Sequence, residues 1–415
     1  MVALTDPFAL EILDDPYDTY AKWRSVAPLY KVPHLDVHLV LSHGAVMEAI
    51  ARVDDFSNNL TAFFMIDDAG KQIMVAAGSD GGVDVLATAD DPFHLVHRRA
   101  LNRPFSEKRM VDIEQELREM VGDLIDAQVA SGAIEWVHGV SNVLPIRAVA
   151  MLLGLPDSDS ARLKFWSDEG IEVLSGFADG ARMAQCMSHI DEFVQYLGGH
   201  MDAALERMRA GAAPTCVIDT VARAEIDGDY DRHTSLGLLV QLIGAGSDST
   251  TGLTGSCALA LATHPDVQAT LRAQPGLIPA FVEEVLRLET PFRGHFRHVM
   301  RPCRLGDVAL RPDDRILLMW SAANRDPAVF DEPDALRLDR PTAKNHLGFG
   351  WGIHHCIGAP LARLEAHLAV EELLARTKTI ELDPAAAPPS WVPSLFLRRL
   401  DSLSLAVVPA PRLQC

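Results

Sequence analysis

The chain has 415 residues, of which 48% are hydrophobic and 23% are charged, as in ordinary globular proteins with a large core. Its formal net charge of −20 argues against nucleic acid as a partner, because binding to phosphates takes clustered Lys and Arg. Six scattered cysteines, an acidic first segment without an apolar leader, and the lack of any apolar run of about 18 residues predict a soluble, cytoplasmic protein without membrane insertion.

Helical periodicity dominates the chain from about residue 92 to residue 376. Shorter β-like runs occur near residues 27–41, 296–320 and 391–408. The glycine-rich stretch 65–91 predicts a long irregular loop. The longest predicted helix, Thr234–His264, would span roughly 45 Å at ~1.5 Å per residue. Without repeats or linkers, the pattern predicts one domain over residues 1–415, mostly α with a minor β region.

The first chemically informative helix is predicted to begin near Pro92. It carries His94 and Arg98 at positions i and i+4, so both side chains lie on one face. Taken singly, each would be an ordinary exposed polar residue. The segment is also locally basic, and its basic side chains are His97, Arg98, Arg99, Arg103, Lys108 and Arg109.

The middle of the longest helix has poor helix propensity. It reads Gly244-Ala245-Gly246-Ser247-Asp248-Ser249-Thr250-Thr251. Ser and Thr side chains can bond back to the preceding turn and open the hydrogen-bond ladder locally. Glycines in the same place also allow another element to pack closely. From the residues alone, a packing notch and a functional opening are equally compatible with this segment.

Charged residues follow this helix at regular spacings. Glu284 and Arg287 lie three apart, so a carboxylate and a guanidinium can meet on one helical face and form charge-assisted hydrogen bonds. Such pairs are common on solvated surfaces. Arg293 and Arg297 come next, and Arg297 lies ten residues after Arg287.

A glycine-hinged loop then delivers one cysteine to the start of a helix. The loop reads Phe349-Gly350-Trp351-Gly352-Ile353-His354-His355-Cys356-Ile357-Gly358. Gly350 and Gly352 permit positive φ angles, and Pro360 suits a first helical turn. Cys356 therefore lies just before a helix N-terminus, where the helix dipole favours a thiolate. Such a thiolate is either a nucleophile or a metal ligand.

Two other interpretations of the loop remain open at this point. Cys356 can be a buried, inert cysteine beside a glycine turn, since free cysteine is among the most buried residue types. It can also belong to a zinc site, although structural zinc usually takes two cysteines and this loop has one. The histidines of such a site would be His346, His354 and His355.

The pattern Phe-Gly-x-Gly-x-His-x-Cys-x-Gly resembles the haem-binding loop of the cytochrome P450 family. The segment from Ala245 to Thr251 resembles that family's oxygen-binding kink, and the pair at Glu284 and Arg287 matches its Glu-x-x-Arg motif. The stretches DDPYDTYAKWR and SAANRDPAVFDEPDALRLDR are also similar to bacterial members, so the resemblance covers nearly the whole chain. It implies a single triangular-prism domain in which a long central helix crosses the haem.

The resemblance also implies roles for individual residues. Cys356 would be the axial ligand of haem b, surrounded by Phe349, Gly350 and Gly358. The haem propionates would pair with His94, Arg98, Arg297 and His354. Asp248 and Ser249 would deliver protons, although the family's usual threonine is serine here, and Thr250 can share that role. Glu284 and Arg287 would brace the fold. The family's third partner for this pair falls near Ala335, which has no charge.

The implied activity is that of a haem-thiolate monooxygenase, which inserts one oxygen atom from O2 into a C–H bond of a small hydrophobic substrate. No flavin or NAD(P) fingerprint occurs in the chain, so electrons from NAD(P)H would arrive through a ferredoxin and its reductase. The basic segment at residues 97–109 would then form part of a ferredoxin docking site. Equally compatible is an arrangement in which Arg98 serves the haem and the other basic side chains are solvated surface charges. The alternatives are a peroxide-driven peroxygenase and a non-enzymatic haem-binding protein.

The substrate wall is expected to be apolar. Its predicted members are Phe63, Phe64, Met65, Leu242 and Phe292. Arg293 is the charged residue among them. If its side chain faced the haem, it would pair with a carboxylate or carbonyl group of the substrate. The alternative is an arginine that is anchored to a surface acid or to the backbone.

Overall fold

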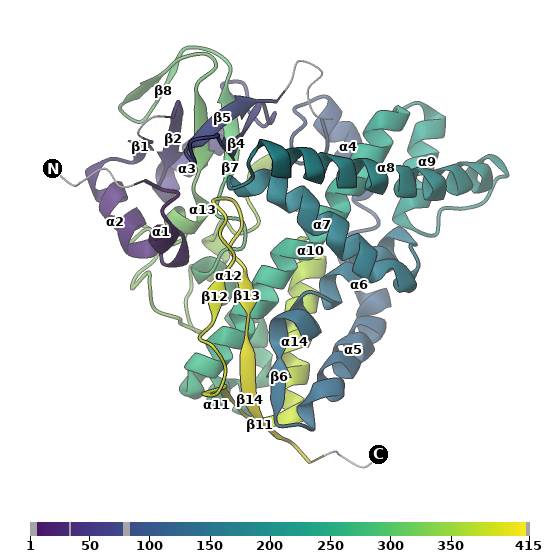
Figure 1. Ribbon diagram of the computed structural model, residues 1–415, viewed down its shortest axis with the longest axis vertical. Coiled ribbons are helices and arrows are strands. Elements are labelled where there is room, and N and C mark those ends of the chain that lie inside the picture. The colour runs from purple at the N-terminus through teal and green to yellow at the C-terminus, as the bar shows by residue number, and fades with distance from the viewer. Residues whose placement is uncertain (1–5, 33–34, 78–83, 412–415) are drawn as a thin grey trace.

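The structure is a computed structural model that describes residues 6–32, 35–77 and 84–411. Helices make up most of it, and small sheets gather at one side and at the lower end in the view of Figure 1. The predicted class, mostly α with a minor β region, is confirmed. None of the described helices is both long and apolar enough to cross a membrane.

The described helices and strands have the following bounds. The helices are α1 (Leu10–Asp14), α2 (Tyr17–Val26), α3 (His43–Ala51), α4 (Phe93–Leu101), α5 (Glu107–Val129), α6 (Leu144–Leu153), α7 (Ser160–Ser175), α8 (Gly180–Arg209), α9 (Val217–Asp227), α10 (Arg232–Thr263), α11 (Pro265–Ala273), α12 (Ile278–Leu288), α13 (Trp320–Ala323) and α14 (Ala359–Arg376). The strands are β1 (Leu29–Lys31), β2 (Val37–Val40), β3 (Phe56–Ser57), β4 (Ala62–Ile66), β5 (Gln72–Ala76), β6 (Ala133–Glu135), β7 (His295–Val299), β8 (Cys303–Leu305), β9 (Val308–Leu310), β10 (Arg315–Leu318), β11 (Thr377–Leu382), β12 (Ser390–Trp391), β13 (Leu400–Ser402) and β14 (Ser404–Pro409).

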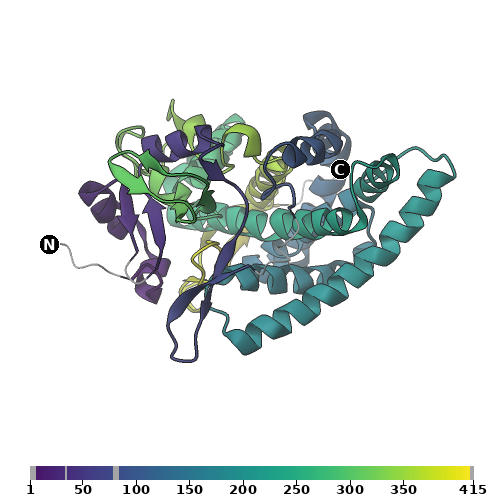
Figure 2. The ribbon, with the colours of Figure 1, turned by 90° about the horizontal axis from the view of Figure 1, so that it is seen from above.

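Helix α10 is the central element, and Figure 2 shows it crossing the middle of the molecule. It begins at Asp231, whose carboxylate accepts a hydrogen bond of 2.8 Å from the backbone N–H of Thr234. Buried residues occur all around α10, so it is enclosed by other elements rather than lying on the surface. Its bounds agree with the predicted helix Thr234–His264 to within two residues.

Glycines in α10 allow two neighbours to approach closely. A Cβ atom on Gly246 would stand 2.7 Å from Cγ2 of Val149 on α6. A Cβ atom on Gly252 would stand 2.7 Å from the carbonyl oxygen of Arg398, just before β13. A side chain at either position would therefore push these elements away. The packing notch that the sequence allowed is present.

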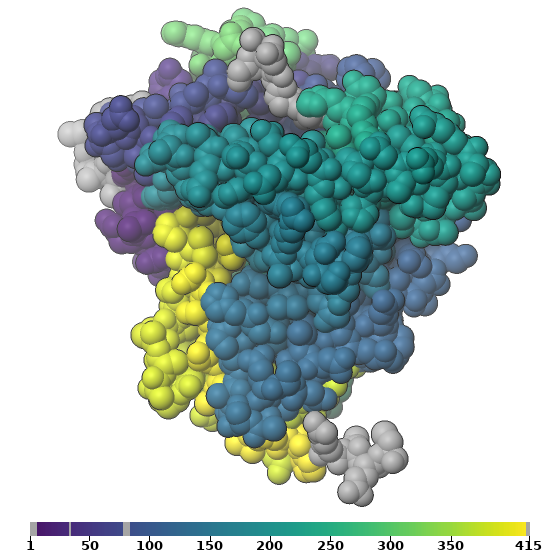
Figure 3. Space-filling model, turned by 45° about the vertical axis from the view of Figure 1, so that its right-hand side comes forward, coloured from purple at the N-terminus to yellow at the C-terminus, as the bar shows by residue number. Residues whose placement is uncertain are grey.

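The largest sheet has the strand order β1-β2-β10-β7-β3, with β2 and β10 parallel and the other pairs antiparallel. In its register Arg297 of β7 lies opposite Ile316 of β10. The sheet packs with the N-terminal helices α1 and α2 around a small core that is separate from the large helical core. Figure 3 shows the teal segment that contains α8 and α9 lying across the upper part of one face of the molecule.

The predicted irregular loop over residues 65–91 is wrong in part, because β4 and β5 form an antiparallel hairpin there. The side chain of Asp67 accepts hydrogen bonds of 2.9 Å from the backbone N–H groups of Ala69 and Lys71, and Gly70 adopts a φ of +78°. This is a turn stabilised by an aspartate and a glycine. Residues 78–83 of the predicted loop lie outside the described residues.

Candidate active site

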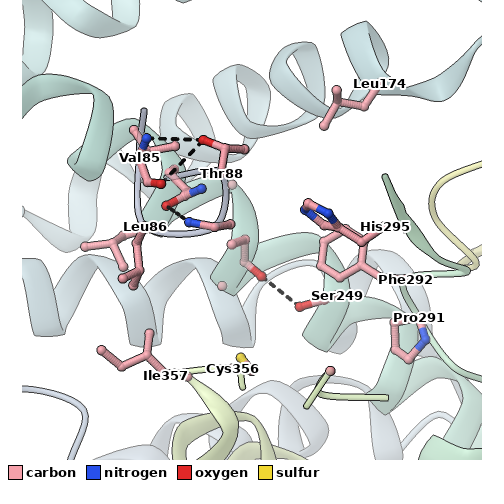
Figure 4. Close-up of a pocket in the computed structure, with 18 of the residues that line it drawn as sticks. Val85, Leu86, Thr88, Leu174, Ser249, Pro291, Phe292, His295, Cys356 and Ile357 are labelled. Atoms are coloured by element: carbon pink, nitrogen blue, oxygen red, sulfur yellow. Dashed lines mark hydrogen bonds between the residues drawn. The ribbon is translucent and has the colours of Figure 1, made fainter. Parts of the chain in front are cut away.

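A cavity of about 460 Å³ lies between α10 and the cysteine loop. Figure 4 looks into it, with Cys356 below, Ser249 beside it and Leu174 on the far side. Aromatic and aliphatic side chains from α7, α10, the segment at 85–88 and the segment at 291–296 form most of the wall. The cavity is thus a largely apolar pocket with a single thiol at its floor.

The cysteine loop has the predicted glycine hinges. Gly350 and Gly352 have φ angles of +66° and +72°, which L-residues rarely adopt. The backbone N–H of Cys356 donates a 2.9 Å hydrogen bond to the carbonyl of Phe349, which closes the loop just before α14. Sγ of Cys356 faces the cavity, and a Cβ atom on Gly358 would come within 3.8 Å of it.

Two opposing effects act on the thiol of Cys356. Desolvation raises its pKa above the ordinary value, and the backbone N–H of Gly358 and the cation of Arg98 partly oppose this shift. The surrounding protein by itself therefore disfavours the thiolate that the helix N-terminus favours. A bound metal ion would reverse the balance, since a coordinated thiol is deprotonated.

Cationic and imidazole groups converge at one edge of the cavity. His94 and Arg98 come from α4, Arg297 from β7 and His354 from the cysteine loop. The rings of His94 and His354 lie 4.1 Å apart between centroids. Burial lowers the pKa of His354 to about 2 and that of Arg297 to about 10. Arg98 donates to the carbonyl of His355, which ties α4 to the loop.

Several buried nitrogens at this edge have no hydrogen-bond partner among the described residues. They are Nε2 of His94, Nδ1 of His354 and Nε1 of Trp320. Orphaned polar atoms of this kind are rare in native interiors. The ring of His295 stacks on that of Trp320, with centroids 6.0 Å apart. This donor set fits a flat group that carries anionic arms, as haem does.

Sequence reasoning did not single out His295 and Trp320. Both line the cavity, and Nδ1 of His295 lies 3.1 Å from Nη1 of Arg297. The alternation of a β-strand could have indicated His295, because residues two apart share one face and Arg297 was a candidate. Trp320 comes from α13 and carries no such local signal.

Asp248 and Ser249 face different directions although they are adjacent. Oγ of Ser249 lies at the cavity and donates a 2.7 Å hydrogen bond to the carbonyl of Ala245 (Figure 4). The fully buried carboxylate of Asp248 is turned toward α7 and is absent from the cavity wall. Thr250 is buried and also lines the cavity.

Asp248 is held by three side chains that sequence reasoning missed. It accepts hydrogen bonds from Nζ of Lys164 at 3.0 Å and Oγ of Ser167 at 2.8 Å, and Nε of Arg399 lies 3.5 Å away. Of these partners only Ser167 also lines the cavity. Asp168 pairs with Lys164 at 2.5 Å, so the cluster continues toward the surface. Lys164 and Asp168 are four residues apart on a helix, and this spacing could have indicated their ion pair from the sequence.

The possible substrate contact of Arg293 is wrong, and the alternative, an arginine anchored to the backbone, is the one that the structure has. Its side chain is fully buried away from the cavity, and Nη2 donates a 2.6 Å hydrogen bond to the carbonyl of Leu13. The other predicted wall residues divide as follows: Phe63, Phe64, Leu242 and Phe292 line the cavity, whereas Met65 does not.

Glu284 and Arg287 form a buried ion pair at 2.8 Å. The charged third partner, which the sequence left open, is Arg340, whose Nε lies 2.7 Å from Oε1 of Glu284. Ala335, where the third partner was expected, contributes its carbonyl instead, and that oxygen accepts from both arginines. All three charged side chains are almost completely buried.

The zinc interpretation does not fit the geometry. Nε2 of His346 lies 2.9 Å from the carboxylate of Glu283, and its Nδ1 accepts from the backbone N–H of Gly348. Both ring nitrogens are therefore engaged away from Cys356. Within the described residues no cluster of three or more His, Cys, Asp or Glu side chains is arranged to hold a metal ion.

The fold and the cavity fit the class of proteins that hold a flat, anionic prosthetic group against a cysteine. Comparison with known proteins agrees. A family model described as Cytochrome P450 matches residues 276–397. Cytochrome P450 144 of Mycobacterium tuberculosis (strain ATCC 25618 / H37Rv) is 40% identical over 402 residues, which cover 96% of this chain and 91% of that protein.

Two further relatives point the same way. Cytochrome P450 monooxygenase PikC of Streptomyces venezuelae is 32% identical over 403 residues, covering 94% of this chain and 91% of PikC. The structure of cytochrome P450 CYP109Q5 from Chondromyces apiculatus superimposes with a TM-score of 0.84 at 29% identity, covering 99% of this chain and all of that one. The chain therefore belongs to the cytochrome P450 family. It is a P450 monooxygenase, and the family implies haem iron as its cofactor, so the resemblance seen in the sequence is confirmed.

Proposed function

We propose that this enzyme inserts one oxygen atom from O2 into a C–H bond of a small hydrophobic substrate, with electrons from NAD(P)H delivered by a ferredoxin and its reductase. The observation that carries the proposal is at the floor of the largely apolar cavity. There the thiol of Cys356 and the hydroxyl of Ser249 both line the same space. Haem b, when bound, supplies O2 activation, helped by the electron-rich thiolate.

The binding of the haem is assigned to the residues around the cysteine loop. Cys356 would hold the haem iron through its sulfur, and Phe349, Gly350 and Gly358 of the same loop line the cavity with it. The haem propionates would pair with the basic edge, which consists of His94, Arg98, Arg297 and His354. The unpartnered nitrogens of His94 and His354 support this assignment, because a propionate would satisfy both.

Proton delivery is assigned to Asp248 together with an alcohol at the cavity. The carboxylate of Asp248 receives protons from the direction of α7, where the ammonium group of Lys164 donates a hydrogen bond to it. The hydroxyl of Ser167 touches Asp248 and also lines the cavity, so it can carry a proton across to Ser249 or Thr250. The apolar wall meanwhile keeps bulk water away from the substrate.

Replacing Ser249 by alanine tests this route. We expect the product formed per NADH to fall about tenfold or more and hydrogen peroxide to rise, because a positioned proton donor contributes about 10²–10⁴-fold in rate. Peroxide and product are measured with a surrogate ferredoxin system. Thr250→Val is the matched comparison: if it uncouples turnover and Ser249→Ala does not, Thr250 is the donor. Unchanged coupling in both variants would refute the route.

The electron donor is expected to bind the surface beside α4 and the cysteine loop, here called the cysteine-side surface. Its exposed cations are Arg99, Arg103 and Lys108, and its exposed apolar side chains are Phe93, Leu95, Trp351 and Ile353. The three cations make no ion pair with any described residue. His97, which the sequence placed among the basic side chains of residues 97–109, is not part of this surface. It is buried, with its ring centroid 5.4 Å from that of Tyr230, so it belongs to the core.

Charge reversal on this surface is the second test. We expect Arg103→Glu combined with Lys108→Glu to slow reduction by an acidic ferredoxin about tenfold at low salt, and the difference to shrink at high salt. Stopped-flow reduction across a salt series measures it. Arg209→Glu combined with Lys378→Glu, at exposed positions on α8 and β11, is the control with the same charge change. Equal rates for the reversed variant and the control would contradict the assignment.

A further inference from the structure

The charge on the cavity wall is confined to one edge. Among the described residues, the charged side chains that line the cavity are Arg98 and Arg297, both at the basic edge. Other cations nearby are engaged elsewhere: Lys164 and Arg399 bind Asp248, and Arg293 bonds to a backbone carbonyl. The part of the cavity above Ser249 therefore offers no cation to an ionised substrate.

Most polar side chains on that part of the wall already have partners. Nδ2 of Asn58 donates to the carbonyl of Ala87 at 3.0 Å, and the hydroxyl of Thr88 bonds within its own turn. Ser167 donates to Asp248. These groups are used to hold the cavity wall together and are not free to bind a ligand.

Gln241 on α10 is different. Its Oε1 accepts a 3.3 Å hydrogen bond from the backbone N–H of Ala87, which fixes the orientation of the amide. Its Nε2 has no partner among the described residues, and the side chain lines the cavity. Two N–H donors are thereby held in place on a wall where the polar side chains named above already have partners. A ligand that carries a hydrogen-bond acceptor can reach them.

We propose that the substrate is a neutral, largely hydrocarbon molecule with one acceptor such as a carbonyl or ether oxygen, and that Gln241 selects it. This rests on the proposed function, because the oxidised carbon must lie beside Ser249. Gln241 and Ser249 are eight residues apart on α10, so at ~1.5 Å per residue the acceptor lies roughly 12 Å from that carbon along the helix. An ionised carboxylate would lose its hydration in the cavity without gaining a partner cation.

The test uses haem-loaded protein and three ligands of one shape: 4-cyclohexylbenzamide, 4-cyclohexylbenzoate and cyclohexylbenzene. Each is titrated while the spin state of the ferric haem is followed. We expect the amide to bind more than about tenfold tighter than the carboxylate, because an unpaired buried charge is unfavourable. The preference for the amide over the hydrocarbon is expected to fall about two- to tenfold in Gln241→Leu, the range of one hydrogen bond.

The ratio of the dissociation constants of two ligands, measured in one variant, is insensitive to a general loosening of the cavity wall. Gln241→Met supplies a second variant if Gln241→Leu folds poorly. Equal binding of carboxylate and amide would overturn the proposal, as would an amide preference that survives both variants. A protein that prefers the carboxylate but still couples NADH oxidation to product refutes only this inference. A protein that binds the amide as expected but yields no product with the ferredoxin system refutes the proposed function instead.

Discussion

Cys356→Ser is expected to abolish monooxygenase turnover. Serine keeps the size and the loop geometry, but its hydroxyl does not ionise as a thiol does and cannot supply the electron density of a thiolate. The fold is expected to survive, because Sγ of Cys356 faces the cavity rather than the core. Haem content, the carbon monoxide difference spectrum and NADH-dependent product formation measure the effect.

Cys303→Ser is the matched control for this change. Cys303 begins β8, is half-buried and lies outside the cavity. We expect that variant to keep its haem spectrum and its turnover. Turnover at the parental rate in Cys356→Ser would show that another residue carries the iron, and it would remove the basis of the proposed function.

Features that depend on neighbours in the sequence could be predicted. The glycine hinges of the cysteine loop follow from residues a few positions apart, and so does the long helix α10, whose first turn is capped by Asp231. The pair at Glu284 and Arg287 needed only helical spacing. Each of these is a local property that tertiary packing did not override.

Contacts between distant segments could not be predicted in the same way. Asp248 meets Lys164 and Arg399, which are 84 residues before it and 151 residues after it in the sequence, and no spacing rule relates such positions. The position of Arg293 also depends on a distant segment. A Cβ atom on Gly294 would stand 2.4 Å from the carbonyl oxygen of Leu318, so the chain passes close to β10 at this point. Strand β7 begins only at the next residue, His295. Arg293 therefore does not share the face of Arg297.

Glu284→Gln is expected to destabilise the protein by about 3–5 kcal/mol, the usual effect of removing one partner from a buried ion pair. The substitution leaves Arg287 and Arg340 buried beside each other without a negative charge. Asp157→Asn is the control, because the carboxylate of Asp157 pairs with Arg147 at 2.6 Å on the surface. Exposed pairs contribute about 0–1 kcal/mol. Urea unfolding followed by circular dichroism measures both variants.

The same ion-pair network should make stability depend on pH. Burial opposes ionisation of Glu284, but the hydrogen bonds from Arg287 and Arg340 outweigh it, so the pKa of Glu284 lies below its ordinary value. A carboxyl group with a lowered pKa stabilises the fold above its unfolded pKa, and this contribution is lost as the pH falls through its folded pKa. The gap in unfolding free energy between parent and Glu284→Gln should therefore narrow in acid. A gap that stays constant with pH, or one no larger than that of Asp157→Asn, would mean that Glu284 does not hold the two arginines by its charge.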